Sequence, residues 1–227
     1  MEWEQLQESL STVRVERYLN ECKKDHKKAT QAYLDNVKVA SSLMPMLHFL
    51  EVALRNRIHI QLKRHFKRDD WWQADELKDI GHELREKVEE SKRKLTRRRE
   101  AVSIDKIVAE LSLGFWTTLL NSEFQMTLWG PIRKAFKNLP KDRKQRQAVS
   151  APLNKVRDLR NRVFHHEPLL WLKDSSAESA HSLGLEVITW LDEDLATWLK
   201  SIDQFGQVWA EVEAKDGFVR QHKVKAS

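Results

Sequence analysis

The chain has 227 residues, enough for one well-buried domain or for two small ones that share a core. It carries 40 lysines and arginines against 34 aspartates and glutamates. Only 6 glycines and 5 prolines occur, so the composition favours helices and predicts an all-α fold with no significant sheet. The single cysteine, Cys22, excludes an internal disulfide and a cysteine metal cluster.

The first predicted helices follow from the spacing of apolar residues. Ser11 is a plausible N-cap, and it is followed at helical spacing by Val13, Arg14, Arg17, Tyr18 and Cys22. From about Lys28 to Phe66 the apolar positions recur at intervals of three and four, over a stretch too long for one average helix. Pro45 is the predicted place for a break, because proline removes a backbone donor. Residues 69–72 are predicted to form a connector.

Shorter elements are predicted in the middle of the chain. A polar helix with a thin apolar stripe is expected from about Asp75 to Lys94. Asp105 is the expected cap of a short helix over residues 107–111. Two apolar helical segments are expected next, over residues 114–120 and 124–136.

The last third of the chain is predicted to hold two long helical stretches. Residues 137–147 form a basic linker, and a helix follows from about Ala148 to His165, where Pro168 enforces its end. The final stretch runs from about Ala177 to Ala214. No linker marks a domain boundary, so we expect one helical bundle of roughly seven to nine helices over residues 1–227.

One segment carries residues suited to chemistry. Arg160, Asn161, His165 and His166 crowd the end of the helix that Pro168 stops. Asn161 and His165 are four residues apart and share one face, whereas Arg160 points elsewhere on an ideal helix. Arg160 and His165 can still meet at one phosphate if the last turn distorts, or across a symmetric dimer.

These residue types suit cleavage of a phosphodiester bond in RNA. A histidine can take a proton from the 2′-hydroxyl or donate one to the leaving oxygen. Arginine donors match phosphate oxygens, and asparagine can orient the imidazole or a phosphate oxygen. Basic residues at the end of a helix also stabilise its dipole, which is the plain structural alternative. Adjacent ligands on a helix point apart, so we expect no metal site and no cofactor.

The same segment, Leu159 to Pro168, resembles the signature of the Abi-like (abortive infection) family of the HEPN superfamily, whose nucleases carry R-N-x-x-x-H. The block from Leu50 to Asn56 resembles the family's L-E-x-x-L-R-N block. Residues 111–116, followed by Leu128-Trp129, resemble its L-S-F-G-F-W…L-W block. The three blocks occur in the family's order across about residues 10–200.

The resemblance implies a HEPN-type helical bundle, a homodimer, and metal-independent RNA cleavage at a composite site, in phage defence or as a toxin. It assigns phosphate binding to Arg160, orientation to Asn161 and acid–base catalysis to His165, with His166 as a helper. The pocket is also expected to take in part of the earlier block, namely Glu51, Arg55 and Asn56. These three residues can equally form an ion pair and hydrogen bonds that tie helices together. Phe164 departs from the smaller residue that the family leads us to expect.

The basic residues from Arg85 to Arg99 form a possible second contact with RNA. Eight basic residues lie there against three glutamates, and a solvated helix face is the alternative explanation. The candidate RNA-binding residues are Lys92, Arg93, Lys94, Arg97, Arg98 and Arg99. Besides a ribonuclease, two alternatives are a non-catalytic RNA-binding protein in a complex with a small structured RNA and a helical protein-binding scaffold. An antitoxin or a small RNA is a possible partner.

The sequence also bears on location. No apolar run approaches the roughly 18 residues that a membrane span needs. The N-terminal residues lack the basic start and apolar core of a signal peptide. We therefore expect a cytoplasmic protein with no membrane partner.

Overall fold

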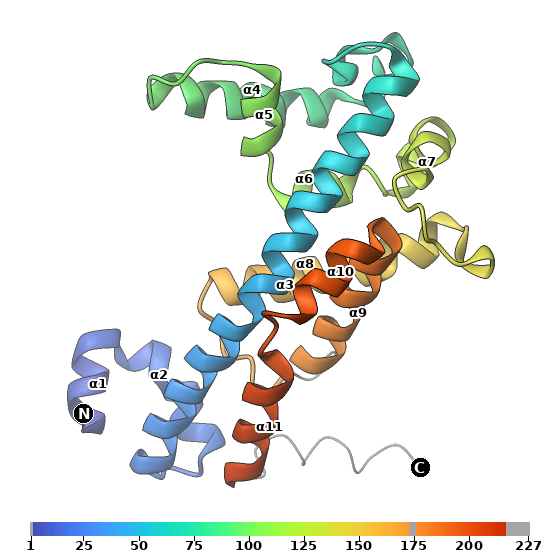
Figure 1. Ribbon diagram of the computed structural model, residues 1–227. Coiled ribbons are helices and arrows are strands. Elements are labelled where there is room, and N and C mark those ends of the chain that lie inside the picture. The colour runs from blue at the N-terminus through green and yellow to red at the C-terminus, as the bar shows by residue number, and fades with distance from the viewer. Residues whose placement is uncertain (1, 173–175, 217–227) are drawn as a thin grey trace. The chain divides into compact units, whose positions relative to one another are not determined.

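The computed structural model describes residues 2–172 and 176–216. These residues form eleven α-helices and four short 3₁₀ helices, and none of them lies in a β-strand (Figure 1). The predicted all-α fold is confirmed. The helices outnumber the predicted seven to nine because several are short and follow caps that the apolar periodicity does not reveal. The HEPN type of this bundle stays a prediction.

The described residues divide into two compact units. The first unit draws on Met1–Pro45, Asp158–His181 and Ile202–Ser227, and the second on Met46–Arg157 and Ser182–Ser201. Two long helices, α3 (His26–Phe66) and α8 (Arg146–Phe164), contribute residues to both. The single domain expected over residues 1–227 stays a prediction.

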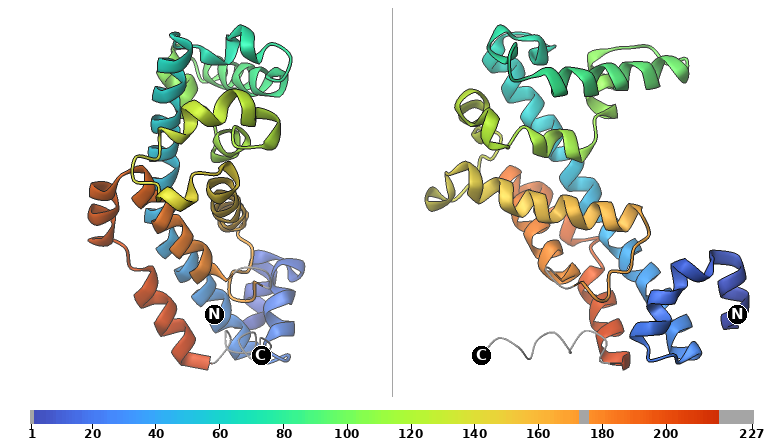
Figure 2. Two further views of the ribbon diagram at one scale, coloured as in Figure 1. Left: turned by 90° about the vertical axis from the view of Figure 1, so that its right-hand side faces the viewer. Right: turned by 180° about the vertical axis from the view of Figure 1, so that it is seen from behind.

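The first unit is built around the N-terminal part of α3. It also contains α1 (Trp3–Leu10), α2 (Thr12–Glu21) and α11 (Phe205–Asp216). Helices α1 and α2, which only Ser11 separates in the sequence, contact each other at the N-terminus, as Figure 2 shows from two sides. Apolar side chains from several of these elements form the core, among them Val15, Tyr18, Ala32, Val39, Leu43, Leu169 and Val212. Each large buried side chain stabilises the fold by about 1.5–3 kcal/mol.

The second unit contains the remaining helices. They are η1 (Trp71–Gln73), η2 (Asp75–Leu77), α4 (His82–Arg97), α5 (Ile104–Glu110), α6 (Leu113–Thr118), η3 (Ser122–Phe124), α7 (Gln125–Arg133), η4 (Lys141–Arg143) and α10 (Glu193–Lys200). Most of α9 (Ala177–Leu191) belongs here as well. Trp71, Trp72 and Trp116 lie in its core.

The break predicted at Pro45 does not occur, because α3 runs without interruption for 41 residues. A proline inside a helix costs about 3 kcal/mol or more. The apolar residues on both sides of the proline, Leu43, Met46 and Leu47, are buried, and their packing holds the helix together.

Three other predicted elements have different limits. The polar helix expected from Asp75 splits into η2 and α4, since Gly81 donates its N–H to the carbonyl of Leu77 at 2.7 Å and ends the first turn. The cap of α5 is Ser103, not Asp105, and its hydroxyl accepts from the N–H of Lys106. The final stretch divides into α9, α10 and α11. Asp192 caps α10, and Asp203 accepts from the first N–H of α11, so each aspartate starts a new helix.

One helix does meet the length and composition of a membrane span, contrary to the expectation from the sequence. An 18-residue window within α3 has a mean hydropathy of 1.3, and 33% of it is buried. The buried central helix of a protein that never enters a membrane can pass the same test, so this observation is weak evidence for a membrane span.

Candidate active site

The end of α8 has the geometry of a Schellman cap. The N–H of Glu167 donates to the carbonyl of Arg162 at 2.9 Å, and that of His166 donates to the carbonyl of Val163 at 3.1 Å. His166 occupies the left-handed position of this cap, with φ of 56°, where glycine is the usual residue. The chain therefore leaves the helix at His166, two residues before the proline expected to stop it.

Two distant elements hold the segment that follows, residues 165–171, which we call the motif loop. Asn36 of α3 is buried, and its Oδ1 accepts from the N–H of Leu169 at 2.6 Å while its Nδ2 donates to the carbonyl of Glu167 at 3.3 Å. Arg17 of α2 donates to the carbonyl of Trp171 at 3.1 Å. These bonds satisfy loop backbone groups that lie outside regular structure. The loop therefore has a defined position relative to α2 and α3.

The two histidines open onto a cleft at the surface of the first unit. The cleft has a volume of about 350 Å³ and is lined by Ser11, Val13, Arg14, Arg17, His165, His166, Glu167 and Pro168. Arg14 donates through Nη1 to the carbonyl of His166 at 3.1 Å and reaches that of His165 at 3.5 Å. Both histidines are exposed, so a ligand in the cleft can reach them. The one carboxylate of the cleft, Glu167, is paired with Arg162 at 2.9 Å.

Arg160 and Asn161 lie one turn earlier on α8. The guanidinium carbon of Arg160 lies 4.3 Å from the centroid of the Phe164 ring, in a cation–π contact. Phe164, which departs from the family's expected smaller residue, is thus a support for the arginine. Asn161 is exposed, and its carbonyl accepts from the N–H of His165 at 2.9 Å. The structure brings His165 and His166 together with Arg14, while the meeting of Arg160 and His165 at one phosphate stays a prediction.

Sequence reasoning missed three residues of this site. The sequence pattern indicates only that Arg14 and Arg17 belong to a helix, now α2. It likewise indicates no functional role for Asn36 within α3. The available signal was two arginines, three positions apart, on the same helix as the apolar Val15 and Tyr18. Nothing in the sequence pairs Asn36 with a loop 131 residues away.

The residues of the earlier block lie in the second unit and bind backbone there. Glu51 accepts through Oε1 from the N–H of Leu113, in the first turn of α6, at 3.1 Å. Arg55 donates to the carbonyl of Ala109 near the end of α5 at 3.1 Å and to the side chain of Asn56 at 3.4 Å. A carboxylate at the start of a helix and a guanidinium at the end of one both stabilise the helix dipole. These contacts favour the structural alternative for Glu51 and Arg55. They also bring together two of the three blocks that resemble the Abi-like family. Glu51 lies in the block from Leu50 to Asn56, and Leu113 lies in the block over residues 111–116.

No family model, curated protein or solved structure matches the chain. The resemblance to the Abi-like family therefore depends on the three sequence blocks alone. Among the described residues, no three side chains of histidine, cysteine, aspartate or glutamate form a group that could hold a metal ion.

The basic cluster of the second unit is partly neutralised by neighbouring acids. Lys92 pairs with Glu89 at 2.6 Å and Lys94 with Glu90 at 2.9 Å. Arg98 pairs with Glu100 and Glu110. The other three members, Arg93, Arg97 and Arg99, are exposed. Exposed ion pairs contribute little stability, so phosphates can compete for these cations. The role of the cluster in RNA binding stays a prediction.

Proposed function

We propose that the protein is a ribonuclease that cleaves RNA without a metal ion at the end of α8. The observation that carries the proposal is the cleft in which His165 and His166 lie beside Arg14 and Arg17. Imidazoles can transfer protons near neutral pH, and guanidinium groups bind phosphate oxygens. Acid–base and anion-binding groups therefore share one exposed cleft.

The reaction uses the 2′-hydroxyl of the RNA as its nucleophile. One histidine takes the proton of that hydroxyl while its oxygen attacks phosphorus, and the bond from phosphorus to the 5′-oxygen breaks. A second group, which acts as an acid, donates a proton to the departing 5′-oxygen. The products are a 2′,3′-cyclic phosphate on one fragment and a 5′-hydroxyl on the other. No metal takes part in this sequence of proton transfers.

His165 is the proposed acid or base, and His166 is its helper. Arg160 binds the scissile phosphate, on the same chain or across a homodimer, and Asn161 orients the site. Arg14 adds a guanidinium to the cleft. Within the described residues its hydrogen bonds use Nη1, which leaves Nε and Nη2 to donate to a phosphate oxygen. A cytoplasmic role in phage defence or as a toxin, neutralised by an antitoxin or a small RNA, is part of the same proposal.

Chemically altered substrates test the mechanism. A labelled RNA is incubated with the protein beside the same sequence carrying 2′-O-methyl groups. The expected result is cleavage of the RNA to fragments ending in 2′,3′-cyclic phosphate, with no cleavage of the methylated strand, which lacks the nucleophile. Cleavage of both strands at equal rates would overturn the proposal.

A further inference from the structure

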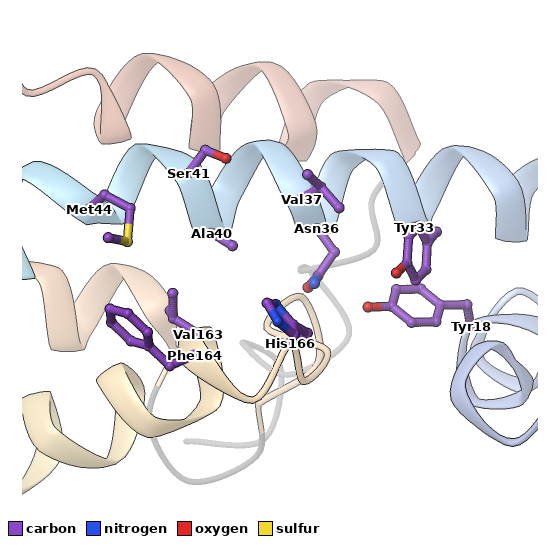
Figure 3. A pocket seen from close by; sticks show the side chains of 10 residues that line it. All are labelled: Tyr18, Tyr33, Asn36, Val37, Ala40, Ser41, Met44, Val163, Phe164 and His166. Atoms are coloured by element: carbon purple, nitrogen blue, oxygen red, sulfur yellow. The ribbon is translucent and has the colours of Figure 1, made fainter. Parts of the chain in front are cut away.

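A second cavity, of about 360 Å³, lies within the first unit beside the motif loop (Figure 3). Residues of α2, of α3 and of the end of α8 line it. His166 lines both this cavity and the cleft of His165. We call it the tyrosine pocket, after Tyr18 and Tyr33.

One end of the tyrosine pocket is polar. The rings of Tyr18 and Tyr33 lie 5.0 Å apart, and Figure 3 shows both hydroxyls at the end of the pocket where His166 lies. Tyr18 is only 1% exposed, and its hydroxyl has no hydrogen-bond partner among the described residues. A buried hydroxyl without a partner destabilises the protein, and a bound group with the right polarity would supply the missing hydrogen bond.

The pKa of Tyr18 supports its role as a hydrogen-bond donor. Burial raises this pKa well above the ordinary value of 10.0, and the neighbouring Tyr33 raises it further. The hydroxyl therefore stays protonated under all ordinary conditions, and it can both donate and accept.

The other end of the pocket is apolar. Met44 and Phe164 line it, and both are partly exposed, at 40% and 45%. The volume lies within the range of pockets that bind small organic molecules. A methionine sulfur and an aromatic ring are both suited to the face of a flat ring.

The pocket is also next to the residues proposed to act on phosphate. Phe164 lines the pocket and supports the guanidinium of Arg160 at 4.3 Å. An occupant would therefore contact Phe164, which supports the phosphate-binding arginine, and His166, which also lines the histidine cleft.

From this arrangement we propose that the tyrosine pocket binds one unstacked base of single-stranded RNA, beside the phosphate that is cleaved. The inference rests on the proposed function for the identity of the polymer. A base has a flat apolar face for Met44 and Phe164, and an edge of donors and acceptors for Tyr18 and Tyr33. Unstacked bases are commonly recognised by aromatic side chains in this way. Hydroxyl groups that both donate and accept suit this edge better than they suit a bare phosphate, which offers only acceptors.

Binding is measured without cleavage, in the His165→Ala background, by calorimetric titration of the full chain. The probes are the four nucleoside 5′-monophosphates, with ribose 5-phosphate as the probe that lacks a base. The expected result is saturable binding of at least one nucleotide, about tenfold or more tighter than binding of ribose 5-phosphate.

Three variants locate the binding site. Tyr18→Phe removes only the buried hydroxyl and is expected to weaken nucleotide binding by about 3–10-fold without lowering thermal stability. Ala40→Phe fills the pocket and should abolish binding. Leu34→Phe, on the same helix at a position that is 52% exposed and does not line the pocket, should leave binding unchanged.

The outcomes separate this inference from the proposed function. Three results would overturn the proposal that the pocket binds a base, even if the protein cleaves RNA. They are equal binding of ribose 5-phosphate and the nucleotides, no nucleotide binding, and unchanged binding in both Tyr18→Phe and Ala40→Phe. Nucleotide binding that depends on Tyr18, in a protein that cleaves no RNA, would support base binding by the pocket and overturn the proposed ribonuclease function.

Discussion

Replacing His166 with glycine is expected to stabilise the protein and, at the same time, to slow its cleavage of RNA. His166 has a φ of 56° at the left-handed position of the cap of α8. This conformation costs a non-glycine residue about 1–2 kcal/mol. Glycine offsets about 0.5–1 kcal/mol of this gain in stability, because it has more conformational freedom to lose on folding. Because the His166 side chain is exposed, little packing is lost. The free energy of unfolding should rise by about 0.5–1 kcal/mol, or about 1–4 °C in Tm.

The chain contains a matched control for this change. At the end of α2, the N–H of Lys24 donates to the carbonyl of Leu19 at 2.8 Å and that of Lys23 donates to Asn20 at 3.1 Å, so Lys23 occupies the same position of a similar cap. Its φ is 53° and its side chain is exposed. Lys23→Gly should therefore give a similar gain in stability.

Urea unfolding of both variants and RNA cleavage by both complete the test. His166→Gly should cleave RNA at least about tenfold more slowly, because the imidazole lines the cleft, whereas Lys23→Gly should cleave at the wild-type rate. A loss of stability in His166→Gly beside a gain in Lys23→Gly would refute the reasoning about backbone strain. Undiminished cleavage by His166→Gly would remove its role as a helper.

Three further predictions concern single side chains. Asn36→Ala should lower the free energy of unfolding by about 2–4 kcal/mol in urea titrations, because the buried N–H of Leu169 loses its partner; a loss below about 1 kcal/mol would contradict this. Burial lowers the pKa of His59, whose Nδ1 accepts from Trp71, so its contribution to stability is complete above pH 6.5 and is lost as the pH falls below that value. As the pH falls from 8 to 5, the free energy of unfolding should therefore fall less steeply in His59→Gln than in the wild type. Identical slopes would contradict the assignment of this pH dependence to His59. Arg14→Lys should reduce kcat/KM for RNA by about 10-fold or more, since a lysine cannot reproduce the forked donors; an unchanged value would exclude Arg14 from phosphate binding.

The apolar periodicity predicted most of the fold because it records which residues are buried. The apolar residues at helical spacing in α8, such as Val149, Leu153 and Val156, are all buried. The same periodicity could not place helix ends that depend on single polar caps, such as Asp192. Nor could it show that Pro45 lies within a continuous helix, because tertiary packing compensates for the lost hydrogen bond.

The candidate site was only partly predictable for a related reason. His165 and His166 belong to one short segment, so the sequence shows them together. Arg14 and Asn36 reach that segment from helices distant in the sequence, through hydrogen bonds to backbone carbonyls and amides. Such contacts depend on the backbone of the partner and leave no residue-type signature in it. The value of Phe164 as a support for Arg160 likewise becomes visible only when the two side chains are placed.

The central claim, that the end of α8 cleaves RNA, is tested most directly by incubating labelled RNA with the protein in EDTA. The wild type is compared with His165→Ala, Arg160→Ala and Lys155→Ala, the last an exposed position on the same helix. We predict cleavage by the wild type and Lys155→Ala, and rates about 10²–10⁴-fold lower in His165→Ala with the fold intact. Cleavage by His165→Ala at the wild-type rate would contradict the account.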